Sequence, residues 1–597
     1  MRQDHDQTAD REDRHQADES LTQGAPGAVS RRSLLQLAVA GAGALVSGPV
    51  LAKTGLFGGQ AGAVQQALVP GVISASAPVV GPSVPKFQRE LLLMPQIQPV
   101  RTATEMVLGK RATVKYYDVT QKVGSADLLP SPFPRTEIWG YNGIYPGPLF
   151  RQTENGAYTV VSQTNELPNP TSTHLHSSPT QPAHDGHPDD LTYKKGTVPP
   201  GKLSEFDGGP VYDGTHVYRY PNRAEARTLW YHDHAMHQTA ENVYKGLVGM
   251  FIQDPDAARI TRFGLDKLPK GKYDVPLVIA DMQFNEDGTV AYDDKGHDSL
   301  WGNVILVNGR AWPKLTVDRT RYRFRILVAD LSRGYSLELS PGSAGSAAPT
   351  VTAIATEAGL LTTPVAVKEW RQGMAERYEF VIDFSNAKAG EKFTLLNRAG
   401  DGDMAQVMQF VAAGPVVASS PVPAQLNDYV FGAEEKEAVN LASPRHFRFE
   451  RSNGLWVING LPWNGRVAAA PQVNTVEKWV LENKSGGWFH PIHIHLVDFQ
   501  IISRNGQPPY DYEKGWKDVV YVGPNETIEL VMRFTAADKV DASKPVTGRY
   551  VMHCHNLIHE DHDMMTQFST DSADALVATN ASMDMGASMM VQWTLDA

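Results

Sequence analysis

Residues 553–564 have the sequence His-Cys-His-Asn-Leu-Ile-His-Glu-Asp-His-Asp-Met, and residues 490–495 have the sequence His-Pro-Ile-His-Ile-His. A set of two histidines and one cysteine with a weak axial methionine selects copper and is typical of electron-transfer centres. Zinc is the less favoured metal, because it requires neither a thioether nor the many further histidines of this chain. The two stretches supply such a set from His490, Cys554, His559 and Met564.

The remaining histidines of these stretches belong to a wider pattern of His-x-His pairs. The chain contains four such pairs, whereas its 19 histidines in random order would give about one or fewer. Side chains two residues apart on a strand point to the same side, so each pair can direct two imidazoles at one place. By the same alternation, Cys554 faces its own metal while its two neighbours face the other way. The pairs are His174/His176, His232/His234, His493/His495 and His553/His555.

The composition limits the classes of function. The chain has 597 residues, which at ~150 residues per domain predicts two to four domains. Its 66 acidic and 55 basic residues give a net charge of −11, which argues against nucleic-acid binding because phosphate contacts need a basic surface. A single cysteine excludes an intrachain disulfide framework and any metal site built from several cysteines.

Two of the histidine pairs lie early in the chain and two lie late, so we expect a site between distant segments.

The beginning of the chain has the features of an export signal. Residues 30–35 are Ser-Arg-Arg-Ser-Leu-Leu, and an apolar, Gly-rich run continues to Ala52. Paired arginines before such a run predict a twin-arginine signal over residues 1–52, and therefore an extracellular, periplasmic or cell-surface location. The run is too short and too interrupted for a membrane anchor, so we expect no stable membrane insertion of the mature chain. Residues 53–85 are predicted to be a linker, and residues 571–597 a Met-rich tail.

The rest of the chain predicts an all-β fold. Short segments rich in β-branched and aromatic residues recur between turn signals, which is typical of sandwiches or barrels. No amphipathic helix longer than about three turns is evident. Pro-rich and polar breaks predict domains over residues 86–256, 273–413 and 428–570. The predicted strands include Ala157–Gln163, Val275–Ala280, Val304–Val307, Tyr322–Leu327, Glu379–Asp383 and Thr527–Phe534.

The histidine motifs resemble the copper signatures of multicopper oxidases, and within that family those of bilirubin oxidases and of the spore-coat type of bacterial laccase. The resemblance extends over about residues 86–570 and is most specific at the copper motifs; in the middle block, Ile305–Gly309 and Ala375–Phe384 fit the family pattern. It implies three cupredoxin-like Greek-key β-sandwich domains, with one copper in the third and a trinuclear cluster between the first and the third. The matching stretches are Thr173–His176, Tyr220–Val248, Gly487–Ser503 and His553–Met565.

The resemblance also implies roles for individual residues around four copper ions. Glu560 is similar to the acid that supplies protons to dioxygen in these enzymes, and Asp185 to the acid near the type 2 copper. Trp488 is similar to a tryptophan beside the type 1 copper of bilirubin oxidases. Asp233 is either an acceptor for a ligand's second ring nitrogen or a residue that faces solvent. The implied ligands are His490, Cys554, His559 and Met564 for type 1, His174 and His493 for type 2, and His176, His232, His234, His495, His553 and His555 for the type 3 pair.

Three classes of function follow. The first is an oxidase that couples one-electron oxidation of bilirubin or other tetrapyrroles, phenols or aromatic amines to four-electron reduction of dioxygen to water. The second is a metal oxidase acting on cuprous, ferrous or manganous ion, which calls for acidic or Met-rich residues near His490. The third is a non-enzymatic structural or copper-binding protein, which would not need a complete ligand set. Copper nitrite reductase is more remote, because it would not need four His-x-His pairs. The expected partners are a small-molecule electron donor and dioxygen, and we expect a monomer.

Overall fold

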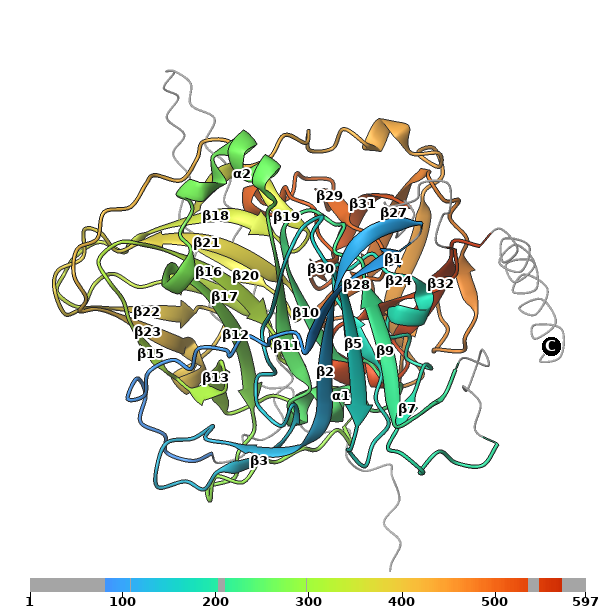
Figure 1. Ribbon diagram of the computed structural model, residues 1–597, viewed down its shortest axis with the longest axis horizontal. Helices are drawn as coiled ribbons and strands as arrows, with labels where there is room; N and C mark the ends of the chain where they lie inside the picture. Colours follow the sequence, from blue (N-terminus) through green and yellow to red (C-terminus); the bar gives the residue numbers. More distant parts are fainter. Residues whose placement is uncertain (1–80, 108, 202–209, 297, 535–546, 572–597) are drawn as a thin grey trace, which may run out of the picture. The chain divides into compact units, whose positions relative to one another are not determined.

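β-Strands form most of the regular structure in the computed structural model, which describes residues 81–107, 109–201, 210–296, 298–534 and 547–571 (Figure 1). The predicted export signal, nearly all of the predicted linker and residues 572–597 of the predicted tail lie outside the described residues. No helix in the described part of the chain is long and apolar enough to cross a membrane.

The first block of strands forms a five-stranded sheet, a four-stranded sheet and a small two-stranded pair. The larger sheet has the order β1-β2-β5-β9, with β3 beside β2, and the smaller has the order β4-β11-β10-β6. The strands are β1 (Arg101–Val107), β2 (Lys110–Ala126), β3 (Thr136–Tyr141), β4 (Phe150–Thr153), β5 (Tyr158–Asn165), β6 (Thr173–Leu175), β7 (Thr192–Tyr193), β8 (Tyr212–Asp213), β9 (Thr215–Tyr220), β10 (Arg227–Asp233) and β11 (Val248–Asp254).

The middle block forms a seven-stranded sheet, β14-β13-β12-β16-β21-β18-β19, and a five-stranded sheet, β15-β23-β22-β17-β20. In Figure 1, β16, β21 and β18 of the larger sheet lie side by side. The strands are β12 (Asp274–Met282), β13 (Val304–Val307), β14 (Arg310–Ala311), β15 (Lys314–Thr316), β16 (Arg321–Val328), β17 (Tyr335–Leu339), β18 (Thr350–Thr356), β19 (Gly359–Val367), β20 (Glu369–Gln372), β21 (Arg377–Asp383), β22 (Glu391–Asn397) and β23 (Gln406–Ala412).

The third block has two five-stranded sheets, β25-β24-β27-β31-β29 and β26-β33-β32-β28-β30. The second of these sheets carries most of the copper motifs of this block. The strands are β24 (Arg445–Ser452), β25 (Leu455–Ile458), β26 (Val467–Ala469), β27 (Val476–Asn483), β28 (His490–Ile494), β29 (Phe499–Arg504), β30 (Val519–Val522), β31 (Thr527–Arg533), β32 (Arg549–Cys554) and β33 (Met565–Ser569).

The predicted all-β class is confirmed, and all six strands predicted from the sequence are present, with ends that differ by at most a few residues. In the described part of the chain the α-helices are α1 (Thr239–Lys245), α2 (Ala257–Phe263) and α3 (Leu557–Asp561), all short as predicted. Asp561 of α3 accepts hydrogen bonds from the backbone N–H groups of Thr239 and Ala240, which fixes α3 against the first turn of α1. The third block is thereby tied to the first.

One apolar cluster extends into all three blocks, beside separate clusters within the first and the third. One cluster of buried side chains includes Trp230 of the first block, Phe380 of the middle block and Leu557 of the third. Among the described residues, each sheet contains strands from only one of the predicted domain ranges. The bounds of these ranges remain predictions. Residues 87–91, at the start of the first range, form backbone hydrogen bonds with Trp312 and Lys314 of the middle block.

A buried arginine also joins the first and middle blocks. Arg325 of β16 is fully buried and forms ion pairs with Asp274 (Nε–Oδ1 2.8 Å) and Glu379 (Nη1–Oε1 2.7 Å). It donates a further hydrogen bond to the hydroxyl of Thr228 on β10 (3.0 Å). Burying a guanidinium is tolerated only when it is paired and hydrogen-bonded, as it is here.

Candidate metal centres

The strands place the histidine pairs side by side. His174 on β6 lies opposite His232 on β10, and His493 on β28 lies opposite His553 on β32, each across an antiparallel ladder. Since residues i and i+2 share a side of a strand, the second histidine of each pair extends beyond the strand end toward the same region. Two neighbouring strands in each block therefore present four imidazoles to the other block.

Eight imidazoles from the first and third blocks meet through their Nε2 atoms in three groups. Every group contains histidines from both blocks, which confirms the predicted location between distant segments. All eight side chains are buried. The Nε2–Nε2 distances are 2.9 Å for His176–His232, 3.2 Å for His176–His555, 3.1 Å for His234–His553, 3.3 Å for His495–His553 and 3.1 Å for His174–His493.

The opposite ring nitrogen, Nδ1, is hydrogen-bonded to a backbone carbonyl or a carboxylate in six of the eight rings; the Nδ1 atoms of His234 and His555 have no hydrogen-bond partner among the described residues. Such an acceptor keeps the proton on Nδ1 and leaves the Nε2 lone pair free for a metal. Three rings donate to backbone oxygens: His174 to Asp185, His232 to Asp233 and His493 to Asp518. The carboxylate contacts are His495–Asp185 (2.7 Å), His176–Asp518 (3.3 Å), His553–Glu560 (2.8 Å) and His234–Glu560 (3.5 Å).

A separate group is formed by His490, Cys554 and His559. Cys554 Sγ lies 3.3 Å from His490 Nδ1 and 3.7 Å from His559 Nδ1, and all three side chains are fully buried. In His490 and His559 the roles of the two ring nitrogens are exchanged: Nδ1 faces Cys554, and Nε2 is the atom that contacts the surrounding protein. His490 Nε2 contacts Ser485 Oγ (2.7 Å), and His559 Nε2 donates to the carbonyl of Asp298 (2.8 Å).

The two methionines that follow this motif pack in different places. Met564 is fully buried in the same apolar cluster as Cys554, and its carbonyl accepts a hydrogen bond from the Cys554 N–H (3.1 Å). Met565 packs in another cluster, with Met236 and Trp463. The packing therefore favours Met564 over Met565 as the thioether beside Cys554.

The alternation predicted around Cys554 is present. Cys554 is directed to His490 and His559, whereas His553 and His555 contribute to two different imidazole groups. The thiol and the imidazole groups are consequently adjacent in the covalent chain.

The comparisons with known proteins agree with this geometry. Multicopper oxidase family models match residues 122–207 and 436–574. A bilirubin oxidase of Albifimbria verrucaria is 37% identical over 512 residues, which cover 82% of this chain and 82% of that protein. The chain belongs to the multicopper oxidase family. A laccase of Bacillus subtilis (strain 168) is 32% identical, covering 80% of this chain and 97% of the laccase. The crystal structure of a laccase from Pediococcus acidilactici superposes with a TM-score of 0.66 at 25% identity, covering 81% of this chain and 94% of that chain.

The side chains of this multicopper oxidase fit type 1 and trinuclear copper sites. Burial lowers the pKa of His490 and His555 to about 3 and that of His234 to about 4, so these imidazoles are neutral ligands at neutral pH. Two or three Nε2 lone pairs that face one another repel unless a cation lies among them. Burial raises the pKa of the Cys554 thiol, so a bound cation is also what would hold this sulfur as a thiolate.

Three supporting residues could not be identified from the sequence. Ser485, Asp298 and Asp518 hold ligand nitrogens, yet none belongs to a histidine motif that would have marked it. The sequence offers Asp233 either as an acceptor for a ligand's ring nitrogen or as a solvent-facing residue, and it is an acceptor, through its backbone rather than its side chain. Its carboxylate instead accepts hydrogen bonds from Ser172, Ala235 and Asn242, and only its backbone carbonyl contacts His232.

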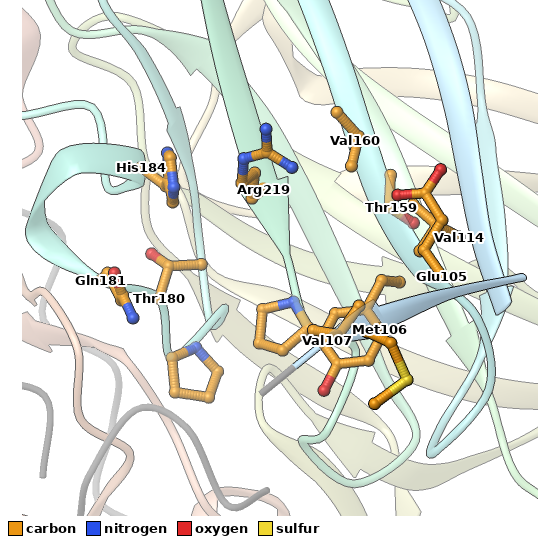
Figure 2. A pocket seen from close by; sticks show the side chains of 13 residues that line it. Glu105, Met106, Val107, Val114, Thr159, Val160, Thr180, Gln181, His184 and Arg219 are labelled. Atoms are coloured by element: carbon orange, nitrogen blue, oxygen red, sulfur yellow. The ribbon is translucent and has the colours of Figure 1, made fainter. Parts of the chain in front are cut away.

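A cavity of about 310 Å³ lies away from these centres, on the sheet formed by β1, β2, β5 and β9 (Figure 2). Arg219, His184 and Glu105 are among its lining residues, and none of the predicted copper ligands is. The lining residue Thr180 connects it to the imidazole groups, since its hydroxyl lies 3.4 Å from Asp185 Oδ1 and Asp185 Oδ2 contacts His495. The side chains of the three imidazole groups and of the group around Cys554 are all buried.

Replacing Met564 by leucine should raise the reduction potential of the type 1 copper while activity persists. An axial thioether donates weakly to copper and stabilises the oxidised state, so its loss favours reduction. The measurement is a redox titration of the blue absorption. Met565→Leu is the matched control and should leave the potential unchanged. The reverse pattern would make Met565 the axial ligand.

The copper-free protein should lose stability as the pH falls from about 6.5 to 5. In the unfolded chain the imidazoles of His490, His555 and His234 take up protons near pH 6.5, whereas in the folded chain they stay neutral down to about pH 3 to 4. The unfolded state then binds more protons, and each of these histidines lowers the free energy of unfolding by up to about 2 kcal/mol at pH 5.

Calorimetric unfolding midpoints of the copper-free protein at pH 7, 6 and 5 measure this effect. Replacing the exposed His446 by glutamine should not alter the dependence of the unfolding midpoint on pH, whereas His490→Gln should reduce this dependence. Equal midpoints at pH 7 and pH 5 would show that these imidazoles are not buried as neutral groups.

Proposed function

We propose that this multicopper oxidase couples one-electron oxidation of organic donors to four-electron reduction of dioxygen to water. One observation carries the proposal. Cys554 forms a group with His490 and His559, while its direct neighbours His553 and His555 reach two separate imidazole groups. One strand end thus connects a single-metal site to a multi-metal site through a few covalent bonds.

The arrangement supports the following ligand roles. When bound, copper would supply one-electron transfer at the cysteine group and dioxygen reduction at the imidazole groups. The protein holds most of the imidazoles in one tautomer, excludes water and keeps the thiol beside two neutral rings. The proposed ligands are His490, Cys554, His559 and Met564 for type 1, His174 and His493 for type 2, His176, His232 and His555 for one type 3 copper, and His234, His495 and His553 for the other.

The surroundings of His559 favour an organic donor over a metal ion. Trp456 stacks on the His559 ring with a centroid distance of 3.8 Å, and the half-buried Trp488 packs edge-on against it at 5.4 Å. The nearby carboxylate of Asp298 is paired with Arg451 (2.5 Å), which offsets its charge and makes it a weaker ligand for a cation. Trp456 is fully buried, so the partly exposed Trp488 is the aromatic surface against which a flat donor such as a tetrapyrrole, a phenol or an aromatic amine could pack. The similarity to a bilirubin oxidase and to laccases supports the same donor class.

Glu560 and Asp185 are the proposed acids of the cluster. Each carboxylate contacts an Nδ1 atom of a proposed type 3 ligand, and both side chains are buried. Burial raises the pKa of Asp185 well above its usual range, so this carboxyl group can hold a proton near the imidazole groups, as general acid catalysis requires. The nearby His553 and His234 lower the pKa of Glu560 to about 2 despite its burial, so its proposed role is to pass protons on to the cluster rather than to store them. We also propose that the chain is exported, on the basis of the paired arginines at residues 31–32.

Cys554→Ser should abolish both the blue colour and the oxidation of every donor. Only a thiolate gives the charge-transfer absorption, and only this sulfur joins His490 and His559 to the flanking histidines. The measurement is oxygen uptake by the copper-loaded protein with bilirubin, a phenol, an aromatic amine, and cuprous, ferrous or manganous ion. The parent should oxidise the organic donors. Exclusive oxidation of the metal ions would instead support the metal-oxidase alternative, and a blue Cys554→Ser variant would reject the type 1 assignment.

Glu560→Gln should leave the blue colour and the anaerobic reduction of type 1 copper nearly intact, while turnover with dioxygen falls about 100-fold. Glutamine keeps the shape but has no transferable proton, and general acid assistance is typically worth ~10²–10⁴ in rate. Asp185→Asn is the comparison variant. Turnover within about threefold of the parent would pass the role to Asp185. Loss of copper would show that Glu560 positions His234 and His553 rather than supplying protons.

A further inference from the structure

Arg377 is a fully buried residue of the middle block that uses every N–H group of its side chain. It begins β21, a strand that carries none of the proposed copper ligands. Its five hydrogen bonds reach all three blocks of strands. They go from Nε to the Thr228 carbonyl (3.1 Å), from Nη1 to the Ala375 carbonyl (2.9 Å) and Asp518 Oδ1 (2.7 Å), and from Nη2 to Ser177 Oγ (2.7 Å) and Asp518 Oδ2 (3.2 Å).

Asp518, the partner of this fork, holds two of the imidazoles. Its Oδ2 lies 3.3 Å from His176 Nδ1, and its backbone carbonyl accepts a hydrogen bond from His493 Nδ1 (2.8 Å). His176 belongs to the first block and His493 to the third. One aspartate therefore orients a ligand from each side of the interface between these blocks.

The ion pair between Arg377 and Asp518 determines the orientation of the Asp518 carboxylate as well as balancing its charge. Two parallel N–H···O bonds determine the plane and position of the carboxylate, which a single bond cannot do. The carboxylate plane in turn determines where the N–H of His176 finds its acceptor, and hence where the opposite Nε2 atom points. Ser177, next to the ligand His176, is held by the same guanidinium.

We propose that Arg377 is a positioning residue for the trinuclear copper cluster, acting through Asp518 on His176 and His493. The inference rests on the copper roles proposed above for these two histidines. It gives the middle block, which supplies no ligand, a direct part in the geometry of the cluster.

The alternative is that Arg377 only stabilises the fold, and Arg325 offers a matched control. Arg325 is equally buried, lies on the neighbouring strand β16 and forms a comparable ion-pair network, yet it contacts no proposed ligand. Lysine at either position keeps the charge but loses the planar fork. A general loss of stability should therefore be similar in Arg377→Lys and Arg325→Lys.

The experiment compares the copper-loaded parent, Arg377→Lys, Arg325→Lys and Asp518→Asn. The readouts are copper content, the electron paramagnetic resonance signal of type 2 copper, its retention against a chelator, the type 1 blue absorption and the thermal midpoint. In Arg377→Lys the type 2 signal should change and copper retention at the cluster should weaken about 10- to 100-fold, while the type 1 absorption per chain stays within about twofold. Asp518→Asn should reproduce this pattern. A variant that combines Arg377→Lys with Asp518→Asn should lose little more type 2 copper than either single variant.

Arg325→Lys should lower the thermal midpoint without altering the type 2 signal. Identical type 2 behaviour of the two lysine variants, or parallel loss of type 1 and type 2 copper in Arg377→Lys, would overturn the inference. A parent protein with no type 2 signal would instead overturn the proposed copper roles, and this inference with them. The two failures are therefore distinguishable by the behaviour of the parent.

Discussion

Mutual repulsion among imidazole lone pairs is the constraint on which the site depends. Eight buried rings present their Nε2 atoms to one another at about 3 Å, and their Nδ1 atoms are mostly held by acceptors on the far side. Such an arrangement is unfavourable without cations, because burial removes the water that would otherwise satisfy the lone pairs. The shared core, the contact between α1 and α3 and the buried arginines keep the first and third blocks close enough to maintain it. Binding of copper and packing of the blocks thus stabilise each other.

The sequence was sufficient for the features that follow from local spacing. Period-2 alternation placed the members of each His-x-His pair on one side and separated Cys554 from its neighbours, and both expectations are met. The strands were predictable for the same reason, since Val304–Val307 and Tyr322–Leu327 combine β-branched or aromatic residues with nearby turn signals. The short helices followed from the absence of long amphipathic patterns.

Features that depend on long-range contacts were not predictable. Asp518 lies 342 residues from His176, and Asp298 lies 261 residues from His559, so no spacing rule connects them. Which atom of Asp233 accepts from the ligand was unpredictable for a related reason. A carboxylate beside a ligand in sequence points to the opposite side of the strand, where Asn242 and backbone N–H groups already satisfy it, and only its carbonyl remains on the ligand's side. Backbone acceptors of this kind leave no signature in side-chain chemistry.

The two kinds of centre also differ in where their ligands originate. His490, Cys554 and His559 all come from the third block, whereas each of the three imidazole groups needs both the first and the third. A small displacement between these blocks would disturb the shared groups and leave the cysteine group intact. Blue colour is therefore a poor measure of competence in any preparation of this protein, because it reports a centre whose metal ligands all come from one block. Specific activity per blue chromophore would reveal what fraction of the molecules is correctly assembled.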